Sequence, residues 1–391
     1  MICPATPTIA GRPVHAGQPP YIVAELSANH NGSLEQAKTL VAAAAATGAD
    51  AVKVQTYTAD SLTLPLDQPP FRIEHGPWAG QRFHQLYTQA ALPLEWTGPL
   101  ADCARDHELT FFSTPFDQVG VDFLERTIDP PAYKVASYEI AHRPLLERIA
   151  ATGKPVILST GMATESEIAR AVGLFRDCGN PLILLKCVSA YPARVDTFNL
   201  RSLATLAEQF NVPVGLSDHT CSDAIALGAI ALGACLIEKH LCLSRSDAGV
   251  DSHFSIEPND FAQLVRKVRE LHAGLGSGHL DANAADQGER RHRRSIFVNQ
   301  RVQAGDTLDE RNLQIVRPGN GLDPWRWDEV CGATATRDLL AGHPLKEGDW
   351  ADQGAPIAVR SAPDAWASAR PERPAYPLPE RASPKASAQP I

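Results

Sequence analysis

The sequence predicts a (β/α)₈ barrel, or TIM barrel, followed by a small C-terminal β domain. Eight short apolar runs occur between residues 21 and 240, and each is followed by an amphipathic stretch. The runs are rich in Val, Ile and Leu without strict alternation, which is typical of parallel strands covered on both faces. Polar groups of one chemical type stand at the ends of the runs, where the active site of such a barrel forms. A doubly wound open sheet is the alternative arrangement of the same elements.

The polar groups at the strand ends are lysines, hydroxyls, histidines and carboxylates. In chain order the eight runs carry Glu25; Lys53 and Gln55; Ser113 and Thr114; Lys134 and Ser137; Ser159; Lys186, Ser189 and Tyr191; Ser217, Asp218 and His219; and Glu238 and His240. Because the carboxyl ends of barrel strands meet at one end, these groups are expected to gather at its mouth. Such a mouth suits a phosphorylated anion together with a metal ion.

Helix start and stop signals follow the strand runs. Ser33 precedes a helical stretch that stops at Gly48. Thr164 and Glu167 form a capping-box pattern, and Pro258 opens the last helix of the barrel. These signals place helices between the strand runs, as the barrel requires.

Composition excludes several classes of protein. The 391 residues are 44% hydrophobic, enough for a barrel core, and the net charge of −9 argues against nucleic-acid binding. The eight cysteines form no CxxC pair, which indicates reduced thiols and a cytoplasmic protein. The first 20 residues lack the apolar core of a signal peptide. The most apolar segment, Ala224–Ile237, has 14 residues where a membrane span needs about 20, so it is expected to form the seventh barrel helix and enter the eighth strand.

Changes in texture divide the chain. The expected segments are an N-terminal extension (1–19), the barrel (20–280), a polar linker (281–294), a compact domain of short β runs (295–352) and a Pro/Ala-rich tail (353–391). The basic run 290–294 is interpreted as part of the solvated linker. The tail is expected to be disordered, because its composition cannot build a core.

The lysines at strand ends are the strongest indication of a ligand. Lys53 with Gln55, and Lys134 with Ser137, could bind a phosphate or carboxylate, with Ser159 adding a hydroxyl. A buried ammonium needs a partner in any case, so a salt bridge to Glu25 or Asp218 is the alternative.

The two histidines end neighbouring strands. Because such strands lie about 4.8 Å apart, His219 and His240 could share a divalent ion, with water and substrate oxygens completing its shell. A structural histidine pair is the alternative. Glu25 could serve as an acid/base group or hydrogen-bond a polyol, or it could belong to a plain helix-entry loop, and Tyr191 could simply pack the rim.

Six segments, taken together, resemble the sialic acid synthase family. They are YIVAELSANHNGS, GADAVKVQTY, YKVASYEI, VILSTGMAT, VGLSDHT and EKHLCLSRSDAGVDSHFSIEP. Residues 295–350, which include RPGNG, resemble the C-terminal antifreeze-like (SAF) domain of that family. Within the family the likeness is closest to pseudaminic acid synthases, through LLKCVSAYPA, LSRSDAGVDSHFSIEP and GPWAGQRFHQLYTQAALPLEW.

The resemblance implies a role for each matching residue. Lys53, Lys134, Ser137, Ser159 and Thr114 would bind phosphoenolpyruvate, with Gln55, Ser189 and Ser217 nearby; His219 and His240 would bind Mn²⁺ or Mg²⁺; Glu25, Tyr191, Asp251 and Arg317 would bind the sugar. Glu25, both barrel lysines and both histidines would be the catalytic groups. Arg317 would reach a neighbouring barrel, because the family forms a domain-swapped homodimer.

The function that the resemblance implies is condensation of phosphoenolpyruvate with an altrose-type 2,4-diacetamido-2,4,6-trideoxy-hexose and water, giving pseudaminic acid and phosphate. N-acetylneuraminate or legionaminate synthesis, from N-acetylmannosamine or a manno-configured sugar, is the alternative. Another phosphosugar barrel such as an aldolase, and a non-catalytic carbohydrate- or ice-binding protein, are the remaining classes. No nucleic-acid or membrane partner is expected.

Overall fold

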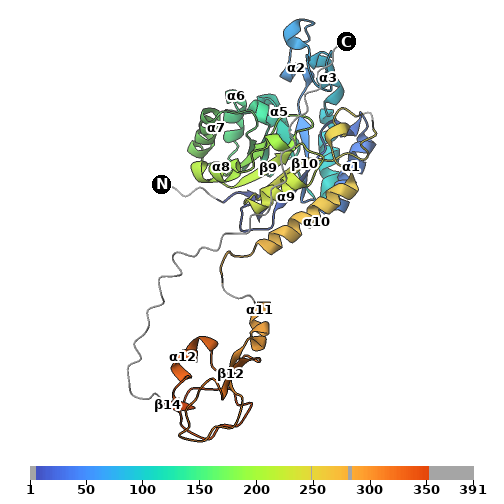
Figure 1. Ribbon diagram of the computed structural model, residues 1–391. Helices are drawn as coiled ribbons and strands as arrows, with labels where there is room; N and C mark the ends of the chain where they lie inside the picture. The colour runs from blue at the N-terminus through green and yellow to red at the C-terminus, as the bar shows by residue number, and fades with distance from the viewer. Residues whose placement is uncertain (1–5, 248, 281–283, 352–391) are drawn as a thin grey trace, which may run out of the picture. The chain divides into compact units, whose positions relative to one another are not determined.

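The computed structural model describes residues 6–247, 249–280 and 284–351, so the Pro/Ala-rich tail predicted at 353–391 lies outside the described residues. The chain forms two compact units, Met1–His279 and Leu280–Ile391, each of which is described by itself (Figure 1). Among the described residues, no helix combines the length and the apolar character that crossing a bilayer requires. All seven cysteines within this described part are free thiols.

The first unit is a closed barrel of eight parallel strands. The strands are β3 (Tyr21–Glu25), β4 (Ala51–Thr56), β5 (Thr110–Pro115), β6 (Tyr133–Val135), β7 (Val156–Ser159), β8 (Leu182–Cys187), β9 (Val214–Asp218) and β10 (Leu236–His240). The barrel closes where β10 pairs with β3, with His240 opposite Glu25, and Glu25 is in turn opposite Lys53 of β4. The predicted barrel is confirmed, and the open sheet is excluded.

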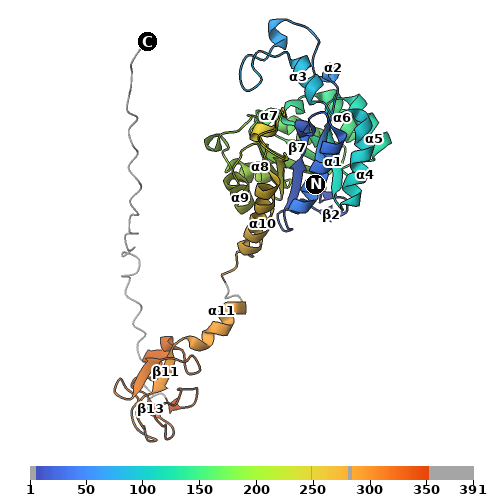
Figure 2. The same ribbon diagram turned by 90° about the vertical axis from the view of Figure 1, so that its right-hand side faces the viewer.

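Helices surround the barrel in both views (Figures 1 and 2). They are α1 (Leu34–Thr47), α2 (Ala59–Leu62), α3 (Phe83–Ala90), α4 (Thr97–Asp106), α5 (Gln118–Thr127), α6 (Arg143–Ala150), α7 (Glu165–Asp177), α8 (Ser202–Phe210), α9 (Ala224–Ala231) and α10 (Pro258–Leu275). The predicted caps are confirmed: the Ser33 hydroxyl accepts from Gln36 N, the Thr164/Glu167 capping box is complete, and Gly48 ends α1 with φ +82°. The segment that carries α2 and α3 projects from one end of the barrel.

An N-terminal hairpin seals the opposite end of the barrel. Strands β1 (Thr8–Ile9) and β2 (Arg12–Pro13) pair antiparallel within the predicted N-terminal extension. Ile9 and Val14 are fully buried and belong to an apolar cluster that fills the barrel interior at the N-terminal ends of the strands. The polar strand ends are therefore left as the open end.

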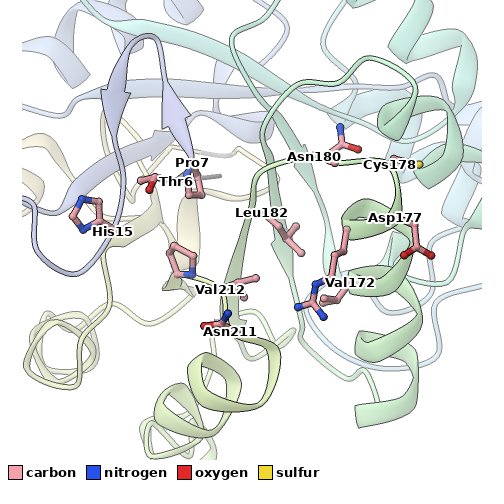
Figure 3. Close-up of a pocket in the computed structure, with 13 residues that line it drawn as sticks. Thr6, Pro7, His15, Val172, Asp177, Cys178, Asn180, Leu182, Asn211 and Val212 are labelled. Carbon is pink, nitrogen blue, oxygen red and sulfur yellow. The ribbon is translucent and has the colours of Figure 1, made fainter. Parts of the chain in front are cut away.

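A cavity of about 560 Å³ lies beside this hairpin, at the N-terminal ends of β8 and β9 (Figure 3). Its walls come from the hairpin, the C-terminal end of α7 and the entries to the two strands, with Val172, Leu182 and Val212 among the apolar side chains. None of the site residues predicted from the sequence lines this cavity.

The second unit is a small β domain with its own apolar cluster, which includes Ile296, Leu308 and Leu345. Its elements are α11 (Ala284–Glu289), β11 (Ser295–Val298), β12 (Leu313–Val316), α12 (Trp327–Val330), β13 (Thr334–Ala335) and β14 (Trp350–Ala351). Buried Asp349 accepts hydrogen bonds from Arg337 and Lys346 N and pairs with His343, which fixes the turn before β14. Part of the predicted linker, Ala284–Glu289, is helical.

Candidate active site

The polar strand ends of the barrel form a narrow cup at its open end. The predicted residues that line it are Lys53, Gln55, Thr114, Lys134, Ser137, Ser159, Tyr191, Ser217, His219 and His240, and Phe116, Ala136, Tyr138, Cys187 and Glu238 complete the lining. Lys186, at the end of β8, is half-buried but does not line the cup. The barrel thus brings together side chains that are up to 187 positions apart in the sequence, between Lys53 and His240.

Two lysines and two carboxylates form a buried charge cluster in this cup. Lys53 forms an ion pair with Glu25, and its Nζ lies 3.6 Å from Glu238 Oε1. Lys134 Nζ lies 3.7 Å from the same Glu238 oxygen. All four side chains are at most 6% exposed. The ion pair between Lys53 and Glu25 that the sequence left as an alternative is therefore present, and it lies within the candidate anion site.

Burial and the neighbouring charges shift the pKa values of the clustered residues in opposite directions. Burial lowers the pKa of Lys134, although nearby Glu238 opposes that shift. Burial raises the pKa of Glu25, with Lys53 lowering it and Glu238 raising it further. For Glu238 burial also favours a raised pKa, but Lys134 and Lys53 outweigh it and hold the pKa of that carboxyl below its usual value.

Glu238 is a residue whose role the sequence analysis did not assign. The sequence places it among the polar strand ends, and in the structure it lies between the two ammonium groups and accepts a hydrogen bond from the Ser217 hydroxyl at 3.4 Å. Alternation along β10 could have identified it, because residues two apart on a strand face the same side and His240 faces the cup.

Hydroxyl groups line the wall of the cup next to Lys134. Gly161 N donates to Ser137 Oγ at 2.9 Å, which leaves the Ser137 hydroxyl hydrogen free to donate elsewhere. Ser159 Oγ is buried and has no hydrogen-bond partner among the described residues. A Cβ at Gly161 would meet Ser189 Oγ at 2.4 Å and Ser137 Oγ at 2.9 Å, so this backbone must pass close to the hydroxyls. Ser189 packs here, behind the lining.

The two histidines lie side by side at the ends of β9 and β10. Their ring centroids are 5.3 Å apart and the rings meet edge to face. His219 Nδ1 lies 2.9 Å from Val188 O, a hydrogen bond that needs the Nδ1–H tautomer and leaves the lone pair on Nε2. Burial is the largest of the effects that lower the pKa of His240 well below its usual value.

This arrangement fits an open divalent metal site. Both imidazoles can present a lone pair, and one has the second hydrogen bond to a carbonyl that metal-binding histidines usually make. His240 Nδ1 is buried without a hydrogen-bond partner among the described residues. Within the same part of the chain, no group of three His, Cys, Asp or Glu side chains could hold a metal, so other ligands would have to complete the shell.

Cys187 is a second lining residue that the sequence analysis did not assign. Its thiol is buried, and Sγ lies 4.0 Å from His219 Nδ1 and 3.9 Å from Ser189 Oγ. Burial would raise the pKa of this thiol, but His219, Ser137 and Lys134 together outweigh burial and lower the pKa. The strand-end position of Cys187 was the available signal.

A hydrogen-bonded chain connects the cup to Asp251. Gln55 Nε2 donates to Ser27 Oγ at 3.1 Å, and the Ser27 hydroxyl donates to Asp251 Oδ2. Ser27 N also donates to Glu25 Oε1 at 2.8 Å. Burial raises the pKa of Asp251, while Ser27 opposes that shift. Gln55, Glu25 and Asp251, all predicted site residues, therefore share one positioning residue, Ser27.

Tyr191 lines the cup beside His219, whereas Arg317 lies in the other unit. The Tyr191 ring lies 4.4 Å from the His219 ring, so it covers the imidazole instead of packing at an outer rim. Arg317 follows β12 in the second unit, where its side chain is exposed and has no hydrogen-bond or ion-pair partner among the described residues.

A cup of paired ammonium groups, hydroxyls and imidazoles at the carboxyl ends of (β/α)₈ strands is the arrangement expected of a barrel enzyme that acts on an anionic substrate. The model described as the NeuB family matches residues 40–280, and the SAF domain model matches residues 293–349. The chain belongs to the NeuB family, and its barrel is followed by a SAF domain.

Similar curated relatives include two pseudaminic acid synthases and one N,N'-diacetyllegionaminic acid synthase. The pseudaminic acid synthase of Campylobacter jejuni subsp. jejuni (strain 81-176) is 42% identical over 84% of this chain and 96% of its own length. That of Helicobacter pylori (strain 26695) is also 42% identical, over 85% of this chain and 98% of its own. The N,N'-diacetyllegionaminic acid synthase of Campylobacter jejuni is 34% identical, over 83% and 98%.

A solved structure agrees with the fold. The N-acetylneuraminic acid (sialic acid) synthetase from Leptospira borgpetersenii, crystallised with citrate, is 33% identical and superposes with a TM-score of 0.65. The match covers 72% of this chain and 94% of that one.

Replacing Glu238 with Gln is expected to strengthen anion binding in the cup. The change removes the negative charge that lies 3.6 and 3.7 Å from the two ammonium groups, so inorganic phosphate should bind at least about tenfold more tightly. Isothermal titration of metal-free protein with phosphate measures this. Glu147→Gln, on the exposed face of α6, is the control for net charge. An unchanged phosphate affinity in folded Glu238→Gln protein would mean that the lysines do not form an anion site.

Proposed function

We propose that this protein is a nonulosonic acid synthase that condenses phosphoenolpyruvate with an altrose-type 2,4-diacetamido-2,4,6-trideoxy-hexose and water to give pseudaminic acid and phosphate. The observation that carries the reaction is the cup itself, in which two buried lysines and several hydroxyls, that of Ser159 unpaired among the described residues, lie beside two imidazoles. The sugar is supported by sequence identity, which is 42% to pseudaminic acid synthases and 34% to the legionaminic relative.

In this proposal the floor of the cup binds phosphoenolpyruvate. The ammonium groups of Lys53 and Lys134 neutralise its phosphate and carboxylate, and they stabilise the phosphate as its C–O bond breaks. Ser137 and Ser159 have hydroxyl hydrogens free to donate to these oxygens. The Thr114 hydroxyl accepts from Lys53 Nζ at 3.0 Å and can donate onward to the same anion.

His219 and His240 would hold the divalent ion, Mn²⁺ or Mg²⁺, whose chemistry is to polarise the aldehyde oxygen of the open-chain sugar. C3 of phosphoenolpyruvate then attacks the aldehyde carbon, and water adds at C2 before phosphate leaves. The fixed hydrogen bond from His219 to Val188 O orients the first imidazole. Burial lowers the pKa of His240, which favours the neutral imidazole that a metal ion needs.

Glu25 would accept and later release a proton during these steps. Its Oε1 is held by Ser27 N–H, and its other oxygen faces the Lys53 ammonium. A carboxyl whose pKa is raised by burial is suited to take up the proton of the attacking water and release it later. Asp251 and Tyr191 would contact the sugar.

The second unit would complete the site in a domain-swapped homodimer. Arg317 supports this role, because its guanidinium is exposed and has no partner among the described residues. An arginine fork suits the acetamido or carboxylate oxygens of a substrate. We therefore assign Arg317 to the barrel mouth of a second copy of the chain.

The substrate assignment predicts a definite product. Purified protein given phosphoenolpyruvate, Mn²⁺ and a sugar panel should release phosphate with the altrose-type diacetamido sugar and little with N-acetylmannosamine. The panel also includes the manno-configured diacetamido sugar, and mass spectrometry identifies each nine-carbon acid. A clear preference for either of the other two sugars would replace pseudaminic acid with the corresponding product.

The metal assignment predicts that activity and metal content are lost together. His240→Ala and His219→Ala should each abolish turnover and bound Mn²⁺ while the circular dichroism spectrum is kept, and chelation should act reversibly. His15→Ala, by the cavity at the far end of the barrel, is the matched control. An active, metal-free His240→Ala protein would instead mark the pair as structural.

The dimer assignment predicts complementation between two inactive variants. Mixing Arg317→Ala with Lys53→Ala chains should restore up to about a quarter of wild-type activity, since half of the dimers at equal mixing carry one intact site. A chain with both changes, mixed with Lys53→Ala, is the control and should stay inactive. If subunits exchange without any recovery, Arg317 does not act across the dimer.

A further inference from the structure

Four aromatic side chains form a continuous cluster above the two histidines. We define this aromatic cluster as Trp78, Tyr191, His253 and Phe254. Tyr191 and Phe254 form its inner row. The ring centroids of Phe254 and His240 are 4.8 Å apart, and those of Tyr191 and His219 are 4.4 Å apart. The inner row therefore covers the carbonyl end of any sugar bound at the imidazole pair.

Trp78 and His253 form the outer row of the cluster. Their rings meet edge to face with centroids 5.9 Å apart. The ring centroids of Trp78 and Tyr191 are 6.2 Å apart, and those of His253 and Phe254 are 5.0 Å apart. Among the described residues, neither makes a ring contact with His219 or His240. The outer row therefore lies one ring further from the imidazole pair than the inner row does.

Both outer side chains are held by folded loop structure. Trp78 lies in a turn between α2 and α3 that is closed by hydrogen bonds from Gly80 N to Ile73 O at 2.8 Å and from Ile73 N to Gln81 O at 2.9 Å. His253 belongs to the 3-10 helix Ser252–Phe254, next to the predicted sugar residue Asp251. The cluster thus joins two loops that follow different barrel strands, β4 and β10.

One buried polar atom in the outer row lacks a hydrogen-bond partner within the described part of the chain. His253 Nε2 is buried and has no hydrogen-bond partner among the described residues. Leaving such a buried atom unpaired is costly, so a ligand that pairs with it gains affinity. Apolar ring surface beside one unpaired nitrogen matches a group that carries both a methyl and an amide.

We propose that Trp78 and His253 are specificity-determining residues, which bind the end of the sugar remote from its carbonyl. Trp78 packs against the C6 methyl, and His253 Nε2 hydrogen-bonds the 4-acetamido group. The inference rests on the proposed function and names the part of the substrate that this wall selects. A wall of aromatic rings lowers kcat/KM for a sugar with an added hydroxyl by about 100-fold at most. A buried nitrogen that needs a hydrogen-bond partner adds selectivity for the sugar that carries the amide.

The test compares two sugars in matched variants. Wild type, Trp78→Ala, His253→Ala and His253→Phe, which keeps a ring but removes the nitrogen, are assayed with the altrose-type diacetamido sugar and with N-acetylmannosamine. Each of the three changes should lower the ratio of kcat/KM values between the two sugars at least tenfold, mainly through KM for the diacetamido sugar. The KM for phosphoenolpyruvate should stay within twofold. Phe83→Ala, in α3 and stacked on Tyr87 outside the cluster, is the matched control.

The outcomes separate the inference from the function on which it rests. If wild type prefers the diacetamido sugar and folded variants keep that preference within twofold, the inference fails and the function stands. If the variants lose kcat and raise the KM for phosphoenolpyruvate without changing the ratio, the cluster supports the cup as a whole and the inference also fails. If wild type prefers N-acetylmannosamine, the proposed sugar and the inference are both overturned.

Discussion

The site depends on four charges that neutralise one another inside a closed barrel. Glu25 and Glu238 offset the cost of keeping Lys53 and Lys134 charged in this interior while no ligand is bound, because an unpaired buried ammonium is very costly. The pairing keeps both lysines available before any ligand arrives. Under the proposed function, an anionic substrate enters by exchange: its oxygens take over part of the compensation that the carboxylates supply. Closure of β10 onto β3 is what brings these charges together, since it sets Glu25 between Lys53 and His240.

The floor and the wall of this site differ in what they can determine. The floor consists of strand-end side chains whose backbone is fixed by barrel hydrogen bonds, and it suits the part of the reaction that uses phosphoenolpyruvate. The wall consists of loop residues such as Trp78 and His253, which can change without disturbing the strands. Reaction type and sugar choice are thus carried by different structural layers.

The sequence was sufficient for the fold and for most of the floor. Strand ends are local features, so Lys53, Lys134 and His240 could be placed at one mouth from the βα pattern alone. Glu238 was not given a role, because an acidic residue beside a histidine reads equally well as a metal neighbour or a lysine partner, and only the distances decide. The aromatic cluster could not be seen in advance, since Trp78, Tyr191 and His253 are far apart in the chain and meet only through loop geometry. Arg317 shows a further limit: its exposure is a property of one chain, whereas its proposed partner belongs to another.

The hairpin that seals the far end has a consequence for the order of events. Because Ile9 and Val14 fill that end with apolar atoms, the described residues leave the mouth as the route into and out of the cup. Under the proposed function, phosphoenolpyruvate lies below the sugar, so the sugar blocks its way out. Substrates would then bind to a site with one entrance in a fixed order, phosphoenolpyruvate before the sugar. Phosphate, which lies deeper, would leave only after the nine-carbon product has dissociated. The sealed end of the barrel would thereby impose a compulsory order of binding and release on the catalytic cycle.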